Sequence, residues 1–374
     1  MKQQIPDALF DKHTALIVRE TEPFNAGPPP RLLRQSLITP QNLFFVRNHA
    51  PVPDIDPASY CLKVGGMVGE PMTLSLDEMR SRFTKREVAA TLQCAGNRRD
   101  MLTAIAPVAG EVAWGAEAIS TARWGGVALR DVLGAAGVKD DARHVAFLGL
   151  DEIEKRGERF GFGGSIPVDK ALSSEVILAY EMNGETLPPA HGFPLRAIVP
   201  GYIGARSVKW LSDITLQTEP SDNYYQARAY KLFPPQTDAQ TVDWKQGLML
   251  GELSVNSVIT APAPGAEVEG GSVLVQGYAT AGGSRSVERV DVSTDDGQTW
   301  TTATLSESDE VPWTWRFWEA RLEVPAGTHT IIARAWDSAA NTQPEDPRRI
   351  WNFKGYMNNA WDRVTVNLRL QGVN

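Results

Sequence analysis

Two patterns of apolar and polar positions divide the chain. From Phe44 onward, short apolar runs alternate with polar turns and a few helical patterns, which indicates a mixed α+β domain. After Gly247 apolar residues recur with a period of two between turn residues, and no good helical pattern remains. Because 374 residues exceed what one core comfortably holds, we predict two domains and an N-terminal arm. The predicted bounds are 1–43, 44–245 and 246–374.

The predicted arm is rich in proline and lacks a regular pattern. Gly27-Pro28-Pro29-Pro30 is its clearest irregular stretch. We therefore expect the arm to wrap the surface and to contribute little core of its own.

Local signals place several elements in the first domain. Ser75-x-x-Glu78 is a capping box, which predicts a short helix over Asp77 to Phe83. Val88 to Leu92 reads as a buried strand that leads directly into a loop containing Cys94. Segments 129–133, 144–150 and 208–217 carry mixed helix and strand signals.

The second domain is predicted to consist of short strands. Asp296-Gly297 is a hairpin signal between two of them. This pattern favours an antiparallel sandwich of immunoglobulin type. The predicted strands are Ser272–Ala279, Val287–Thr294, Trp300–Leu305, Trp313–Val324, His329–Trp336 and Arg363–Leu370.

Charge narrows the classes of partner. Lys and Arg total 37 against 45 Asp and Glu, a net charge of −8, so neither nucleic acid nor an anionic membrane suits the whole surface. Any anion site must be a local cationic pocket. No apolar window has the length of a membrane helix, and Met1 to Glu20 lacks an export pattern. We expect a cytoplasmic protein, or a periplasmic one if an export signal has been removed.

Cysteine is scarce, and one of the two residues has a suggestive setting. Cys61 and Cys94 are too few for a disulfide scaffold, a structural zinc site or an iron–sulfur cluster. Cys94 is followed by Arg98 and Arg99, whose charges favour the thiolate, the form that binds metal. The alternative is a small buried core residue, which is the commoner case for a lone cysteine. The pattern alone leaves both interpretations open.

A resemblance adds to this pattern. Thr91-Leu92-Gln93-Cys94-Ala95-Gly96-Asn97-Arg98-Arg99 resembles the molybdenum-ligand motif of the sulfite oxidase and assimilatory nitrate reductase family. Further motifs follow in order, so the resemblance extends from about Phe44 to Trp361. They are Phe44–His49, Ala118–Trp124, Leu178–Gly184, His191–Arg196 and Gly204–Trp210. The resemblance implies a molybdopterin-binding domain over 44–245 and an immunoglobulin-like dimerisation domain over 246–374, in a homodimer.

The resemblance also implies the cofactor and its contacts. Cys94 would be the protein's ligand to a molybdenum otherwise held by the dithiolene sulfurs of molybdopterin. Arg196 and Lys209 suit the phosphate of the pterin, one as a bidentate donor and the other as a point charge. For each, the alternative is a solvated surface charge. The implied cofactor-binding set is Phe45, Val46, Arg47, Asn48, His49, Cys94, Asp151, His191, Arg196, Ser207, Val208 and Lys209.

An oxyanion pocket is implied beside the metal. Several fixed donors are needed there, since a doubly charged product must be held without reorganisation. Lys354 stands where sulfite oxidases carry arginine and nitrate reductases methionine, and its retained charge favours sulfite. The implied catalytic set is Arg47, Arg99, Trp114, Tyr230 and Lys354.

The implied reaction is the molybdenum-dependent oxidation of sulfite to sulfate by oxygen-atom transfer. The sequence has no haem-attachment motif or cytochrome domain, so electrons would pass to an external acceptor, a cytochrome c-type protein or oxygen. Two alternatives remain. One is a reductase of nitrate or another oxyanion on the same cofactor, and the other is a non-catalytic cofactor carrier.

Overall fold

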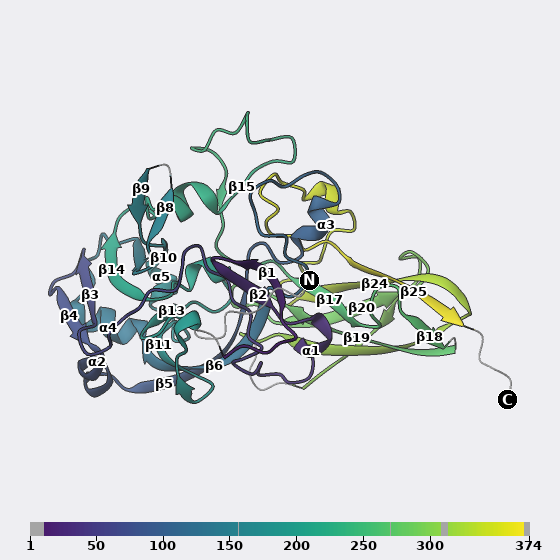
Figure 1. Ribbon diagram of the computed structural model, residues 1–374, viewed down its shortest axis with the longest axis horizontal. Coiled ribbons are helices and arrows are strands. Elements are labelled where there is room, and N and C mark those ends of the chain that lie inside the picture. The colour runs from purple at the N-terminus through teal and green to yellow at the C-terminus, as the bar shows by residue number, and fades with distance from the viewer. Residues whose placement is uncertain (1–10, 156, 270, 308–312, 370–374) are drawn as a thin grey trace.

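The computed structural model describes residues 11–155, 157–269, 271–307 and 313–369. Figure 1 shows two lobes side by side along the longest axis, with the N-terminal segment between them. Sheets dominate both lobes. No helix among the described residues has both the length and the apolar character needed to cross a membrane.

The first lobe contains two mostly antiparallel sheets. The strand pair β14 and β3 is the parallel exception. The first sheet has the order β10-β7-β14-β3-β4, formed by Gly163–Pro167, His144–Gly149, Leu211–Gln217, Cys61–Gly66 and Met72–Ser75. The second has the order β12-β11-β6-β5, with β13 also paired to β11, formed by Glu185–Thr186, Ile177–Met182, Ile119–Ala128, Lys85–Gln93 and Arg196–Ile198.

The local predictions for the first lobe are confirmed. Helix α2, Leu76–Arg82, carries the predicted capping box: the Glu78 N–H donates to Ser75 Oγ at 3.2 Å, and the Ser75 N–H donates to Glu78 Oε2 at 2.9 Å. Strand β5 contains the predicted strand and ends one residue before Cys94. In the segments with mixed signals lie α4, Leu129–Ala136, and strands β7 and β14.

Shorter elements connect these sheets. Strands β8 and β9 form a hairpin, and β15 pairs with β16. Their bounds are Ile153–Lys155, Glu158–Phe160, Lys231–Leu232 and Leu248–Met249, beside helices α3, Arg99–Thr103, and α5, Val168–Ala171. Single helical turns lie at Pro189–His191, Gly204–Arg206, Tyr225–Ala229 and Pro347–Arg349.

The second lobe is a sandwich of two sheets around one apolar core. Val275, Trp318, Val290, Ile331 and Val366 are among the buried side chains that the two sheets contribute. One sheet has the order β17-β19-β23-β22, formed by Asn256–Ala261, Gly271–Thr280, Arg316–Val324 and Thr304–Leu305. The other has the order β18-β25-β24-β20-β21, formed by Glu267–Glu269, Asp362–Arg369, Gly327–Asp337, Val287–Ser293 and Thr301–Thr302.

One strand prediction in the sandwich is wrong in detail. The segment 300–305 is two short strands, β21 on β20 and β22 on β23, so the chain passes from one sheet to the other. Ala303 lies between them and is buried. Asp296 and Gly297 both have positive φ in the turn before β21. The predicted strand Trp313–Val324 begins only at Arg316, as β23. The remaining predicted strands are confirmed as far as the described residues reach; Leu370 lies outside them.

The expectation that the arm contributes little core is also wrong. Strands β1, Ile17–Thr21, and β2, Phe24–Gly27, form a hairpin, and α1, Pro30–Leu33, follows. Phe24 is buried in a small apolar cluster, and Leu33 is buried against Trp315 of the second lobe. The prolines restrict this segment without preventing its apolar side chains from filling the space between the lobes.

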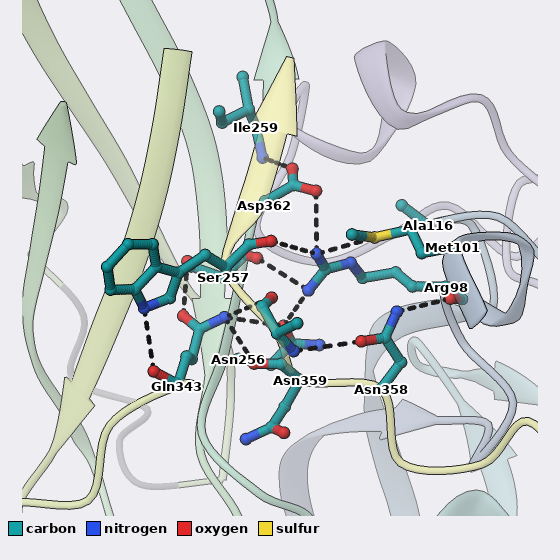
Figure 2. A network of polar contacts seen from close by, with 12 residues as sticks. Arg98, Met101, Ala116, Asn256, Ser257, Ile259, Gln343, Asn358, Asn359 and Asp362 are labelled. Carbon is teal, nitrogen blue, oxygen red and sulfur yellow. Dashed lines mark hydrogen bonds and ion pairs between the residues drawn. The ribbon is translucent and has the colours of Figure 1, made fainter. Parts of the chain in front are cut away.

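A buried polar network joins the loop after Cys94 to the second lobe (Figure 2). Arg98 has a φ of 62° and a side chain that is 1% exposed. Its guanidinium forms an ion pair with Asp362 at 3.0 Å and donates to Asn256 Oδ1 at 2.6 Å. Asp362 Oδ2 in turn accepts from the backbone N–H of Ile259 at 2.7 Å. The loop that carries Cys94 is therefore held by the lobe that does not contain it.

This network predicts a large loss of stability for Asp362→Asn. Removing one partner leaves a buried guanidinium uncompensated, so the free energy of unfolding should fall by about 3 kcal/mol in a urea titration. Asp296→Asn is the matched control, because Asp296 forms an exposed pair with Arg363 at 2.8 Å. It should change stability by less than ~1 kcal/mol. Equal effects of the two substitutions would contradict this role.

Candidate functional site

The structure brings most of the predicted residues together in one pocket of the first lobe. The pocket holds about 680 Å³ of space free of protein atoms, part of it open to solvent. The predicted residues that line it are Phe45, Arg47, Asn48, His49, Cys94, Asp151, His191, Arg196, Ser207, Val208, Lys209 and Tyr230. Val46 does not line it; its backbone pairs with that of Ala26.

Cys94 is presented by a tight loop between two strands. Its N–H donates to Ala118 O at 2.9 Å, just before β6, and its carbonyl accepts from Asn97 N–H at 3.0 Å. The Gly96 N–H donates to the Cys94 sulfur at 3.4 Å. The thiol is buried at the pocket wall, which fixes its position.

One premise about Cys94 needs correction. Arg98 does not face the sulfur, because its guanidinium is bonded to Asp362 and Asn256 of the second lobe. Arg47, distant in sequence, instead lines the same pocket as Cys94. Burial acts to lower the pKa of Arg47, but Tyr230 and Cys94 offset it, and that pKa is raised.

Two largely buried cations lie at the wall formed by β13 and the loop before β14. Arg196 donates to His191 O at 2.8 Å and to Ser207 O at 3.0 Å, and burial lowers its pKa to about 9. Its Nε is buried without a partner among the described residues. Lys209 donates to Asn48 Oδ1 and, at 3.0 Å, to Ala190 O. Burial and then Arg196 hold the pKa of Lys209 well below its usual value.

Other lining residues include aromatic side chains and one carboxyl group. Asp151 Oδ1 accepts from Phe162 N–H at 2.9 Å, and burial raises the pKa of Asp151. His49 stacks on Phe162 with centroids 4.7 Å apart. Burial, followed by the charge of Arg47, keeps the pKa of His49 well below its usual value. His49 is therefore neutral, and its Nε2 lies 3.2 Å from the Tyr230 hydroxyl oxygen.

This donor set fits an anionic, many-edged cofactor. Arg196, which is buried, and Arg47 and Lys209, which are partly buried, line the pocket with the one carboxyl group of Asp151. An anion would therefore relieve the cost of burying these cations. No three His, Cys, Asp or Glu side chains gather into a metal site within the ranges that the structure describes. A metal beside Cys94 would thus need further ligands from a non-protein group, as a dithiolene supplies.

Three members of the predicted catalytic set do not line this pocket. Trp114 is fully buried in an apolar cluster with Phe44 and Trp124. Arg99 lies between Gly96 and Gly355; a Cβ on either would come within 2.3 Å or 2.6 Å of its side chain. Its Nη1 donates to Val112 O at 2.5 Å.

Lys354 is the third predicted catalytic residue outside the pocket, and it forms an ion pair with Glu111. Its side chain is 16% exposed. Tyr356 stacks on Tyr230, with centroids 5.1 Å apart and the rings 18° from parallel. Arg99 lies over the Tyr356 ring at 5.0 Å. Arg99 and Lys354 are therefore connected to Tyr230 through Tyr356.

The sequence interpretation missed several residues near the pocket. Lys12, in the arm, lies 2.6 Å from His191 Nε2 and donates to Gln41 O at 2.6 Å. Burial lowers the pKa of Lys12 to about 7. Glu111 and Tyr356 were missed as well. Lys12 and Glu111 lie outside every quoted motif, so no signal in the sequence pointed to them.

The comparisons with known proteins agree with this geometry. The family model described as oxidoreductase molybdopterin binding domain matches residues 49–225. The model described as Mo-co oxidoreductase dimerisation domain matches residues 248–369. The pocket lies mostly within the first range and the sandwich within the second.

Individual relatives cover almost the whole chain. A sulfite oxidase of Gallus gallus is 48% identical over 94% of this chain and 78% of its own length. A sulfite oxidase of Arabidopsis thaliana is 40% identical over 96% of this chain and 95% of its own. The crystal structure of the sulfane dehydrogenase SoxCD from Paracoccus pantotrophus matches with a TM-score of 0.77 at 24% identity, over 99% of this chain and 91% of that one. This structural likeness supports the two-lobed fold.

The buried position of Cys94 in the pocket generates a prediction. Cys94→Ser should abolish activity while the fold and much of the bound cofactor remain, because serine preserves volume but is a poor ligand here. Molybdenum content by mass spectrometry and pterin content by fluorescence measure this. Cys61, which is exposed, provides the control, and Cys61→Ser should retain both metal and activity. Near-native activity in Cys94→Ser with molybdenum bound would show the assignment to be wrong.

Proposed function

The chain belongs to the sulfite oxidase family of molybdenum-cofactor oxidoreductases, and we propose that it oxidises sulfite to sulfate and passes the electrons to an external acceptor. The observation that carries this proposal is the shared pocket: Cys94, Arg47 and Tyr230 line one buried space together with cationic side chains. When bound, the molybdenum cofactor supplies oxygen-atom transfer and the two-electron redox change.

We assign the protein's part in binding to the pocket side chains. Cys94 is the ligand from the protein to the metal. Arg196 and Lys209 bind the phosphate of the pterin; the free buried Nε of Arg196 and the depressed pKa of Lys209 both favour an incoming anion. Asn48, His49, His191 and the backbone near Ser207 bind its polar edges.

Arg47 and Tyr230 are assigned to the oxyanion. Arg47 supplies a fixed positive charge in a poorly solvated site, where such a charge interacts strongly with a doubly charged anion. Burial raises the pKa of Tyr230, so its hydroxyl remains protonated and available as a hydrogen-bond donor. His49, neutral at ordinary pH, orients that hydroxyl from 3.2 Å.

The alternatives are weighed on charge. A cofactor carrier would need the pterin contacts but no cationic group such as Arg47 beside Cys94. Nitrate is singly charged and needs less positive charge than sulfate, so Arg47 in the pocket favours sulfite. Lys354 contributes less to this argument than its sequence position suggested, because Glu111 already pairs with it.

The second lobe and the location complete the proposal. We infer that the sandwich is of immunoglobulin type and forms a homodimer, which its match to a dimerisation domain supports. The acceptor is a cytochrome c-type protein or oxygen. Cys61 is exposed and unpaired, which suits the proposed cytoplasmic location.

The oxyanion assignment predicts that Arg47→Gln raises the KM for sulfite and lowers kcat. Loss of one charge-assisted donor should reduce kcat/KM by about one to two decades. Steady-state assays with ferricyanide as acceptor measure this, and added sulfate should inhibit the native enzyme competitively. Arg321→Gln on the exposed face of β23 is the control and should leave the kinetics unchanged. Unaltered kinetics in Arg47→Gln would place the anion elsewhere.

A direct comparison of substrates tests the reaction itself. The loaded enzyme should reduce ferricyanide with sulfite and should reduce nitrate with a viologen donor far more slowly, by about two decades or more, because the pocket retains a strong positive charge. Turnover of nitrate without turnover of sulfite would refute the proposed function. Turnover of neither would favour the carrier.

A further inference from the structure

The cationic group beside the pocket contains a carboxylate of its own. Glu111 lies in the segment between α3 and β6, and its side chain is 11% exposed. One carboxylate oxygen pairs with the Lys354 ammonium. The other accepts from the Tyr356 hydroxyl at 3.4 Å and lies 3.7 Å from Arg99 Nη2. Glu111 therefore contacts both cations that sequence comparison assigned to the oxyanion but that do not line the pocket.

The charge of Glu111 also reaches the pocket wall. Burial lowers the pKa of Arg47, but Tyr230, Cys94, Tyr356 and then Glu111 raise it. Burial and Cys94 raise the pKa of Tyr230, Arg47 lowers it, and Glu111 adds to the rise. The formal charge of Arg47, Arg99 and Lys354 is partly cancelled by Glu111 before any substrate enters. An oxyanion and this carboxylate are both negatively charged, so they compete for the same donors.

We propose that Glu111 is a specificity-determining residue that acts as an internal competitor of the oxyanion. It occupies the Lys354 ammonium in the resting enzyme, and a doubly charged anion binds by drawing Lys354 away from it. Glu111 reclaims Lys354 when the product leaves. The carboxylate thereby weakens binding of both sulfite and sulfate and speeds the release of sulfate.

This inference rests on the proposed function and explains how the product sulfate can leave a strongly cationic site. If Arg47 in the pocket and Arg99 and Lys354 beside it were all uncompensated, they would hold sulfate tightly, and product would accumulate on the enzyme. A carboxylate with one flexible lysine partner relieves this, because lysine can exchange partners more readily than an arginine held by several backbone acceptors. Arg99 is held in that way, by Lys354 O and Gly355 O at 3.2 Å each and by Val112 O.

The test compares Glu111→Gln with the native holoenzyme at constant ionic strength. Glutamine keeps the shape but removes the charge, so the KM for sulfite and the inhibition constant for sulfate should both fall by about tenfold. The value of kcat should fall less, through slower sulfate release. In a Lys354→Met background the same substitution should have a smaller effect, since the contested donor is gone. An equal effect in both backgrounds, or no effect in the native one, would overturn the proposal.

A matched control separates this role from a general effect of breaking an ion pair. Lys170 and Glu175 form a pair at 2.5 Å with both side chains 11% exposed, close to the burial of Lys354 and Glu111. This pair does not include the Arg99 and Tyr356 contacts that Glu111 makes. Glu175→Gln should leave the KM and the inhibition constant unchanged. If Glu111→Gln does not fold, Glu111→Asp keeps the charge but shortens its reach, and it should show the same changes at a smaller size. Unchanged constants in a folded Glu111→Asp would then overturn the proposal.

Sulfate binding to the resting holoenzyme, measured by calorimetry, distinguishes this inference from the proposed function. Tighter sulfate binding by Glu111→Gln in a protein that does not oxidise sulfite would refute the proposed function and support the competitor role. Active sulfite oxidation with unchanged sulfate affinity would refute only the competitor role.

Discussion

The buried ion pair between Arg98 and Asp362 is the contact on which the site depends. The guanidinium of Arg98 is 3.0 Å from the Asp362 carboxylate and also donates to Asn256. These contacts join the loop after β5 to the sandwich lobe. A buried charge is stable only with its partners in place, so the loop has one low-energy position relative to the second lobe. Cys94 is four residues earlier in the same loop, and its sulfur inherits that position. The second lobe thus helps to shape a pocket to which none of its described residues contributes lining.

The cations of the pocket are held in an electrostatically unfavourable environment. Arg196 and Lys209 are largely buried with carbonyl and amide acceptors instead of carboxylates, and their pKa values are lowered as a result. Folding supplies the energy that holds these charges in place, and an anionic ligand recovers part of it on binding. This makes the pocket selective for anions even though the chain as a whole carries a net charge of −8.

Beside the pocket, the balance of charge is finer. Arg99 is fixed by backbone carbonyls, and its side chain is closely enclosed by Gly96 and Gly355. Lys354 has Glu111 as its main partner, and its side chain is more exposed than that of Arg99. Rigid and exchangeable cations thus lie next to each other, and both connect to Tyr230 through the stacked Tyr356. The two kinds of cation suit different tasks, since a fixed donor gives affinity and an exchangeable one allows release.

The sequence by itself determined the features that depend on local pattern. The capping box at Ser75, the strand before Cys94 and the period-two strands of the sandwich follow from short-range rules, and motif resemblance indicated the family and most of the pocket lining. Only the tertiary structure decided where long side chains point. Arg98 and Arg99 are adjacent in sequence, yet Arg98 binds Asp362 of the second lobe, whereas Arg99 donates to the backbone carbonyl of Lys354. The pairing of Lys354 with Glu111 joins residues 243 positions apart, and Lys12 reaches His191 across 179. Such pairs arise from the packing of whole segments, which no local pattern encodes, and they set the charge of the site.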